Sequence, residues 1–239
     1  MNSGDPLLLA EKWTVRYVAT LPHEHPELYD PARPELALPH TVEITWNPLE
    51  NALQWTMPPG VDRVQLSVAV GDLAGTELTT GARGYPVGPD GVVELDALPS
   101  PARQARLLVP GTEMSRLLPG PITYRFEEGI LANGSWFAQG LRSYVGAIRM
   151  RQTFRLDDER ARDAMLDLGR VEGAASVEAR LNGKPLGRRV DGPFQFDLAG
   201  HVRRGDNELE LLVRNTPGPD CGVFGPVTIR RSRDSSSKT

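Results

Sequence analysis

The sequence predicts an all-β protein, an antiparallel β-sandwich most simply built from two packed β units. Three observations support this fold class. Apolar residues alternate with polar ones in many short runs, which is the pattern of strands with one buried face. The 24 glycines and 21 prolines are spread without a strict period and separate these runs as turns. Nothing in the pattern alternates strand with helix, so a parallel α/β fold is disfavoured.

Length and charge limit the possible classes further. A chain of 239 residues allows one large domain or two small ones, and it can bury a core without metals or disulfides. The balance of 27 basic against 31 acidic residues, mixed along the chain, gives a net charge of -4. We therefore expect neither nucleic acid nor a membrane as a partner. The single cysteine, Cys221, cannot form an internal disulfide and leaves the redox compartment open.

The N-terminal segment, residues 1–40, is predicted to be extended and proline-rich. Its stretch from Leu21 to Pro39 contains recurrent prolines, which exclude a helix interior and a central strand. The first ten residues lack a basic region and a long apolar run, so no signal peptide is recognised. The localisation stays unknown, and it would be cytoplasmic if this is the complete chain.

Residues 41–118 are predicted to form a first β-sandwich unit. Its strand candidates alternate apolar and polar residues or lie between Gly, Pro and Asp. They are Val42–Trp46, Leu53–Trp55, Val64–Val70, Val92–Leu95 and Ala105–Val109.

Residues 119–231 are predicted to form a second β unit, and residues 232–239 a disordered tail with little apolar content. The strand candidates of this unit are Ile122–Phe126, Ala147–Phe154, Ala164–Leu168, Val177–Leu181, Phe194–Leu198, Glu208–Val213 and Val227–Ile229. Asn182-Gly183 predicts a tight hairpin turn, because both residues tolerate a positive φ. A weak repeat between the two halves, in which Arg63–Val68 resembles Ser176–Leu181, also favours two units.

A series of motifs in the second unit carries a resemblance to a known family. The motifs are Gly120–Tyr124, Gly134–Trp136, Gly140–Gly146, Arg149–Phe154, Leu166–Val171, Leu181–Gly183, Gly192–Leu198, Gly205–Leu209, Val213–Thr216 and Gly222–Val227. In this order they resemble the sugar-binding-type, galactose-binding-like jelly-roll domain of family 2 glycoside hydrolases. The resemblance is strongest to the C-terminal region of family 106 α-L-rhamnosidase-like proteins. It covers residues 120–230 and implies a jelly-roll fold more directly than an activity.

Catalysis by this chain is disfavoured. The resemblance implies that the hydrolytic carboxylates lie in a separate large domain, and 239 residues of strand pattern leave no room for a catalytic barrel. The carboxylate pairs Glu127-Glu128 and Asp157-Asp158 are adjacent in sequence, so in a strand they point to opposite faces. His23 and His25 lie in the proline-rich segment without a specified third ligand. We therefore assign no catalytic residue, no metal site and no cofactor.

Six residues are candidates for binding a sugar. Trp136, Phe137, Arg142 and Tyr144 lie close together in a loop-rich stretch, where aromatic faces and planar polar groups suit a pyranose ring. Arg188 and Asp191 follow the Asn182 hairpin and are candidates for a neighbouring rim. The alternatives are that Trp136 and Tyr144 fill one end of the sandwich and that Arg188 and Asp191 are simply solvated. Asn133-Gly134-Ser135 also matches a glycosylation acceptor.

The function predicted from the sequence is a non-catalytic carbohydrate-binding or accessory β-sandwich module of glycoside hydrolase type. Its expected partner is a glycan, or a catalytic glycosidase domain or subunit against which it packs. One alternative is a structural or assembly module that binds a protein partner. Another is that the chain is the C-terminal part of an α-L-rhamnosidase-like glycoside hydrolase.

Overall fold

The structure is a computed structural model that describes residues 6–18, 38–40, 45–47, 52–66, 76–96, 100–108, 122–142, 144, 146–156, 164–215 and 220–231. Strands joined by turns make up nearly all of these residues, so the predicted all-β class is confirmed. The chain divides into two compact units. Unit 1 comprises Met1–Thr14, Ala132–Ser135 and Ala147–Thr239, and unit 2 comprises Val15–Leu131 and Trp136–Gly146.

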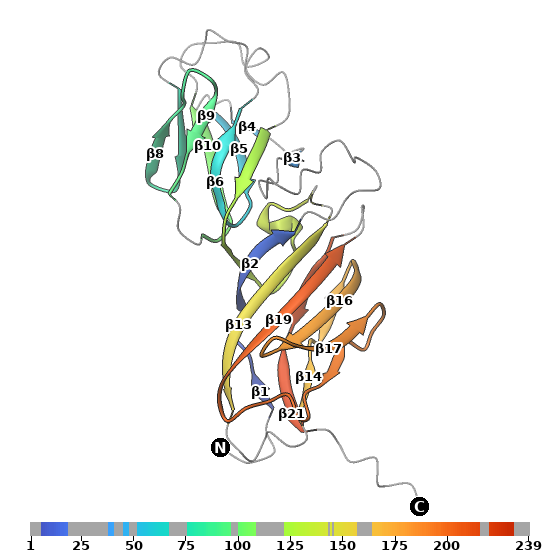
Figure 1. Cartoon of the computed structure of the whole chain (residues 1–239). Helices are drawn as coiled ribbons and strands as arrows, with labels where there is room; N and C mark the ends of the chain where they lie inside the picture. The colour runs from blue at the N-terminus through green and yellow to red at the C-terminus, as the bar shows by residue number, and fades with distance from the viewer. Residues whose placement is uncertain are drawn as a thin grey trace, which may run out of the picture. The chain divides into compact units, whose positions relative to one another are not determined.

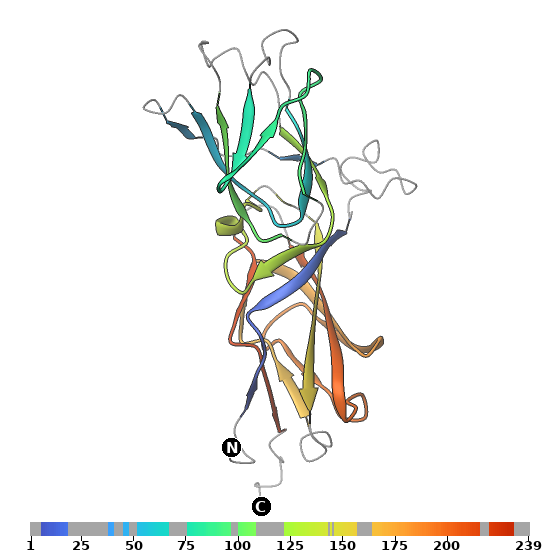
Figure 2. The ribbon, with the colours of Figure 1, turned by 90° about the vertical axis from the view of Figure 1, so that its left-hand side faces the viewer.

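Unit 1 is built on strands from both ends of the chain. Its strands are β1 (Leu7–Leu8), β13 (Ala147–Leu156), β14 (Ala164–Asp167), β15 (Arg170–Glu172), β16 (Ala174–Leu181), β17 (Lys184–Arg189), β18 (Gln195–Asp197), β19 (Gly205–Asn215), β20 (Gly222–Gly225) and β21 (Thr228–Arg231). One sheet has the order β1-β21-β14-β18, and β15 pairs with β20 in a separate ladder. Figure 2 shows the N-terminal strand β1, in blue, beside β21, in dark red, where Leu7 pairs with Ile229.

The larger sheet of unit 1 has the order β12-β2-β13-β19-β16-β17, and its strands from β13 to β17 pair antiparallel. Figure 1 shows β13, β19, β16 and β17 side by side. The strands β2 (Lys12–Val18) and β12 (Gly129–Ala132) contain the points at which the chain passes between the units. The core is formed by fully buried side chains from both main sheets, including Ile148, Val177, Leu211, Leu166, Phe196 and Ile229.

The hairpin predicted at Asn182-Gly183 joins β16 to β17. Asn182 has a φ of 52° and Gly183 a φ of 80°, so both adopt the left-handed conformation that such a turn requires. Leu181 pairs with Lys184 directly across the turn. The sequence prediction of this turn is confirmed.

Unit 2 is a sandwich of two antiparallel sheets. Its elements are β3 (Leu38–His40), β4 (Thr45–Asn47), β5 (Ala52–Met57), β6 (Val61–Gln65), β7 (Glu77–Thr80), β8 (Arg83–Pro86), β9 (Val92–Glu94), β10 (Arg103–Leu108), β11 (Ile122–Phe126) and the short 3-10 helix η3 (Phe137–Gln139). The sheet orders are β4-β5-β10-β7-β8 and β3-β11-β6-β9. Trp55, Leu78 and Leu107 from the first sheet share one core with Val64 and Tyr124 from the second.

The boundaries of the two units differ from those of the predicted domains, because each unit is built from separate stretches of the chain. Residues 119–131 and 136–146, which we assigned to the second β unit, belong to unit 2. The first fourteen residues, which we assigned to an extended segment, belong to unit 1, because β1 pairs with β21. Pro39 of β3 lies at a sheet edge, where a missing N–H costs least. The predicted proline-rich stretch 21–37 and the tail 232–239 lie outside the described residues.

Candidate functional site

Trp136 and Tyr144, two of the three aromatic residues predicted to bind a sugar, lie in the interior of unit 2. Trp136 is 1% exposed and Tyr144 is 2% exposed, and their rings meet edge to face with centroids 6.4 Å apart. Tyr17 packs on Tyr144 at 5.4 Å. The hydroxyl of Tyr17 donates a 2.8 Å hydrogen bond to the carbonyl of Pro59, and burial raises its pKa well above the ordinary value. Buried rings present no open face for stacking, so this packing favours the structural alternative for Trp136 and Tyr144.

Phe137 and Arg142 lie nearer the surface of unit 2. Phe137 begins η3 and is half-buried, whereas Arg142 is exposed. The guanidinium of Arg142 lies over the ring of Phe137, with its Cζ 5.7 Å from the ring centroid. Such a cation-π contact stabilises a surface loop and occupies one side of the ring. A ligand-binding role for this pair stays a prediction.

Arg188 and Asp191 belong to unit 1, whereas the other four predicted residues belong to unit 2. Arg188 lies on β17, and Asp191 follows it in a turn, and both are exposed. The structure therefore gathers Trp136, Phe137, Arg142 and Tyr144 in one unit and places Arg188 and Asp191 in the other. Whether either pair on the surface contacts a ligand stays a prediction.

A hollow that the sequence analysis did not predict lies in unit 1. It has a volume of about 310 Å³ and lies between the N-terminal segment and the end of the chain. Its lining residues are Leu8, Leu9, Glu11, Asn133, Phe224, Pro226 and Val227. This volume is at the lower end for ligand pockets, which suits one sugar ring better than a larger ligand. We call it the Phe224 pocket.

Close packing of the backbone around Gly222 positions Phe224, because no residue larger than glycine fits at position 222. A Cβ atom at Gly222 would lie 2.0 Å from the carbonyl oxygen of Gly134 and 3.3 Å from the Phe224 ring. The guanidinium of Arg170, from the paired strand β15, lies over that ring at 4.4 Å from its centroid. Arg170 also forms a 3.4 Å ion pair with Glu172. The half-buried ring of Phe224 is therefore held by its neighbours.

Asn133 supplies the amide of the pocket. Its Oδ1 accepts a 2.8 Å hydrogen bond from Nε1 of the buried Trp13, and its backbone N–H donates to the carbonyl of Glu11 at 2.7 Å. A Cβ atom at Gly225 would lie 3.2 Å from Nδ2 of Asn133. Within the described part of the chain no hydrogen bond is recorded for Nδ2, so this donor is available to a ligand. Glycosylation of the Asn133-Gly134-Ser135 motif would modify this same Nδ2 atom, and it stays a prediction.

The chemistry of the Phe224 pocket suits a sugar with free hydroxyl groups. The Phe224 ring offers an apolar surface, Nδ2 of Asn133 a donor, and the exposed carboxylate of Glu11 an acceptor. The sequence analysis did not select these residues, because Glu11, Asn133 and Phe224 lie far apart in the chain and pattern reasoning is local. The one available signal was a phenylalanine within Gly222–Val227, a segment rich in Gly and Pro.

Several motifs of the resemblance have structural roles in unit 1. Asn207 is buried, and its Oδ1 accepts hydrogen bonds from Nδ2 of Asn182 and from the backbone N–H of Arg203, each at 2.9 Å. Its Nδ2 donates to the carbonyls of Arg203 and Gly205 at 2.9 Å. The motifs Leu181–Gly183 and Gly205–Leu209 therefore lock two turns together.

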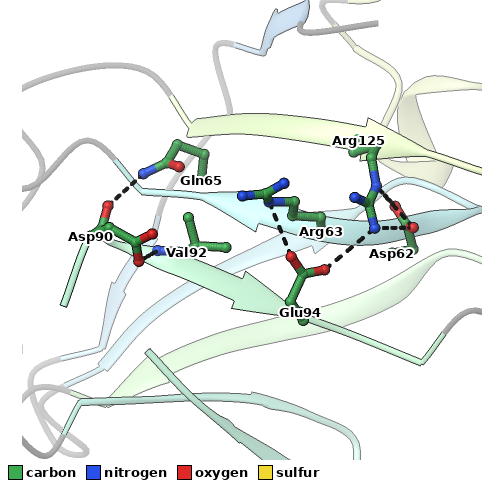
Figure 3. A network of polar contacts seen from close by, with 7 residues as sticks. All are labelled: Asp62, Arg63, Gln65, Asp90, Val92, Glu94 and Arg125. Atoms are coloured by element: carbon green, nitrogen blue, oxygen red, sulfur yellow. Dashed lines mark hydrogen bonds and ion pairs between the residues drawn. The ribbon is translucent and has the colours of Figure 1, made fainter. Parts of the chain in front are cut away.

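A polar network in unit 2 is likewise structural. Figure 3 shows Arg125 of β11 reaching Asp62 on the adjacent strand β6 and Glu94 on β9, the strand beyond β6. Asp62 is 4% exposed, and both of its oxygens accept hydrogen bonds from Nε of Arg125 at 3.0 Å. Arg63 adds a 3.2 Å ion pair to Glu94. The buried charge of Asp62 is thus compensated by a bidentate partner, as a charge removed from water requires.

Other candidate groups provide no reactive centre among the described residues. Glu128 forms an ion pair with Arg16 at 2.8 Å, and its neighbour Glu127 is exposed. Asp157, Asp158, His23 and His25 lie outside the described residues. Groups of three or more His, Cys, Asp or Glu suited to a metal ion do not occur in the part that is described. That same part holds no helix with the length and apolar character needed to cross a membrane.

Comparison with known proteins gives one sequence match and several likenesses of fold. No protein-family model matches the chain. The chain is 34% identical over 87 residues to a "Putative beta-glucuronidase" of Formosa agariphila. The aligned segment makes up 34% of this chain and 7% of that protein. A rhamnosidase from Novosphingobium sp. PP1Y is similar over 81% of this chain and 24% of its own, at 16% identity and a TM-score of 0.38. A beta-glucuronidase from Bifidobacterium dentium is similar over 38% and 16%, at 25% identity and a TM-score of 0.33.

The resemblance to the β-sandwich domains of glycoside hydrolases is confirmed by the sequence match together with the all-β fold. The chain carries an all-β sandwich of this type and is related in sequence to a segment of a much longer protein. It spans 7% of the curated relative that it matches, so the activity of that relative does not pass directly to this chain.

Proposed function

We propose that this chain is a non-catalytic accessory module that binds a glycan through the Phe224 pocket. The observation that carries the proposal is the convergence of the Phe224 ring, a free amide donor on Asn133 and the carboxylate of Glu11 on one hollow of about 310 Å³. An apolar surface surrounded by a few polar groups is the usual composition of a small-molecule site. The kinship to a segment of a glycoside hydrolase supports a role beside a catalytic domain.

The pocket favours a neutral sugar. Glu11 is exposed within it, and its carboxylate would repel an acidic ligand while accepting hydrogen bonds from hydroxyl groups. Nδ2 of Asn133 can donate to a ring or hydroxyl oxygen. The two side chains thus offer a matched donor and acceptor. The glycan would bring a catalytic glycosidase domain close to its substrate, and that domain is the proposed partner of the chain.

A second candidate is an assembly module that packs against a protein partner. Leu8 and Val190 support it, because they are 61% and 56% exposed although their side chains are large and apolar. Protein interfaces on monomers usually use contiguous apolar patches of a few hundred Å². Two separate exposed side chains support protein binding less strongly than the pocket supports glycan binding.

A screen of the full chain against neutral glycans tests the two candidates. Phe224→Ala should abolish the strongest signal, while Val190→Ala, an exposed apolar truncation in the same unit, should retain it. Circular dichroism of each variant separates lost binding from lost folding. Loss of binding in Phe137→Ala with retention in Phe224→Ala would move the site to unit 2. A flat response to all glycans, together with a stable complex with a glycosidase domain on gel filtration, would favour the second candidate.

A further inference from the structure

The outward face of the large sheet in unit 1 is a second surface with an unusual charge pattern. Residues alternate along a strand between the core and the outside, so the outward positions of β13, β19 and β16 form a two-dimensional array. Figure 1 shows these strands side by side with β17. The charged residues on this face are the arginines Arg149, Arg151, Arg155, Arg180, Arg188 and Arg214 and the acidic residues Glu178, Asp206, Glu208 and Glu210.

Glu210 and Glu178 on this face are already paired. Arg149 lies 3.6 Å from Glu210, and Arg214 lies 3.7 Å from Glu178. Both distances are longer than hydrogen bonds, and the side chains are 25% to 45% exposed, so these pairs are loose and solvated. The six arginines still outnumber the four acidic residues of this face, which leaves a net positive charge there on a protein whose net charge is -4.

Arg180, like Arg188, has no side-chain partner among the described residues of this array. It lies directly across from Glu210 in the ladder between β16 and β19. Glu210 pairs with Arg149 on the other side, and no ion pair of Arg180 is recorded among the described residues. Arg180 is exposed, so its guanidinium keeps all its hydrogen-bond donors available.

A shallow hollow lies over this point of the sheet. It has a volume of about 270 Å³ and is lined by Arg149, Glu178, Arg180, Glu210 and Leu212. Leu212 of β19 lies directly across from Arg149 of β13 on one side and from Glu178 of β16 on the other. Its apolar side chain therefore forms the floor of the hollow between charged residues. The hollow combines an apolar floor with an unpaired cation on its rim.

We infer that this hollow binds the carboxylate of an acidic sugar within a glycan chain. The planar guanidinium of Arg180 can donate two parallel hydrogen bonds to a planar carboxylate, and Leu212 would contact the C–H face of the sugar ring. The two glutamates limit the net charge, so one carboxylate satisfies the unpaired arginine, whereas a polyanion such as nucleic acid would meet repulsion. This site is separate from the Phe224 pocket and does not depend on it.

The charge complementarity also predicts the behaviour of the complex. The cations are solvent-exposed, so their attraction to an anion is screened by salt. Binding should therefore weaken strongly when the salt concentration rises from about 20 mM to about 200 mM, because the screening length shortens several-fold.

The test compares three sugars that differ only at C6, titrated into the full chain and followed by NMR chemical shifts. Galacturonate carries a carboxylate, galactose 6-sulfate a sulfate ester and galactose a hydroxymethyl group. We expect galacturonate to shift the backbone amides of Arg180 and Leu212 and to bind at least about tenfold more tightly than galactose. Equal binding of galactose, or binding of galactose 6-sulfate as tight as that of galacturonate, would overturn the assignment to a carboxylate.

Variants locate the site. Arg180→Gln should weaken galacturonate binding about tenfold, and Arg180→Lys should restore part of it, because lysine keeps the charge but loses the planar fork. Arg155→Gln is the matched control: Arg155 lies on β13, is 81% exposed and does not line the hollow. Unchanged binding in Arg180→Gln would contradict the inference. A separate titration of each variant with the neutral glycan from the screen reports on the Phe224 pocket independently.

Discussion

The indole Nε1 of Trp13 donates a 2.8 Å hydrogen bond to Oδ1 of Asn133, and this bond joins two distant parts of the sequence within unit 1. Trp13 lies on β2 and is 1% exposed, whereas Asn133 lies just beyond β12. The bond fixes the orientation of the Asn133 amide. Its Oδ1 is engaged by the fold, and its Nδ2 remains as the donor of the Phe224 pocket.

Replacing Asn133 should separate its structural role from its binding role. Asn133→Ala leaves the buried indole N–H of Trp13 without an acceptor, and we expect the free energy of unfolding to fall by about 1–3 kcal/mol. Asn133→Asp keeps an oxygen for Trp13 but removes the Nδ2 donor, so it should be more stable than Asn133→Ala and still lose glycan affinity. Urea denaturation and the glycan screen measure the two effects. Equal stability of the two variants would argue against the bond.

The buried amide of Asn207 should be among the most sensitive polar positions in unit 1. Asn207→Ala removes four hydrogen bonds and leaves buried backbone groups unpaired, so we expect a loss of about 3 kcal/mol. Its neighbour Asp206 is 81% exposed and lies 4.0 Å from Arg155. Asp206→Ala, as the control, should change the unfolding free energy by less than about 0.5 kcal/mol. Similar losses in both variants would show that the amide does not anchor the turns.

Two glycines with the same backbone conformation should respond differently to alanine. Gly169 has a φ of +64°, and a Cβ there would lie 2.7 Å from the backbone of Gly225. Gly183 has a φ of +80° with nothing within 4 Å of its Cβ position. Gly183→Ala should therefore cost only the left-handed conformation, about 1–2 kcal/mol, and Gly169→Ala clearly more because the paired strands must move apart. Thermal unfolding of both variants provides the comparison, and equal melting temperatures would be inconsistent with the close approach.

The thiol of Cys221 should be inert in the folded protein. Burial raises its pKa from 9.0 to about 12, with Asp220 adding to the shift, so almost no thiolate is present at pH 8. Alkylation at pH 8 should be slow in buffer and fast in concentrated urea. The unfolded chain releases this proton near pH 9, whereas the folded chain keeps it until about pH 12. The contribution of Cys221 should therefore lower the free energy of unfolding as the pH rises from 9 toward 12. Fast alkylation of the native protein would contradict this.

The fold class was predictable because the core strands carry their own pattern. Val64 and Leu66 alternate in unit 2, and Leu209, Leu211 and Val213 alternate in unit 1, and the structure buries all five. Strand β17 carries no such pattern, since its sequence KPLGRR is almost wholly exposed. Only the turn at Asn182 predicted it.

The limits of the units and the pocket were not predictable from local patterns. Trp13 and Val15 alternate on β2, but the pairing of the N-terminus with the C-terminal strand β21 is a long-range contact that no nearby residue reports. The buried position of Trp136 also depends on which unit its loop joins. The sequence around an aromatic residue in a loop does not indicate whether the ring is exposed or covered. For the same reason the convergence of Asn133 and Phe224 required the structure.

The most direct measurement of the central claim is an NMR titration of the full chain with the neutral glycan that the screen selects. If the Phe224 pocket is the binding site, shifts should concentrate on the side-chain amide of Asn133 and the backbone amides of Glu11 and Phe224, and they should vanish in Phe224→Ala. Saturable shifts confined to Phe137 and Arg142, with none at Asn133 or Phe224, would contradict it.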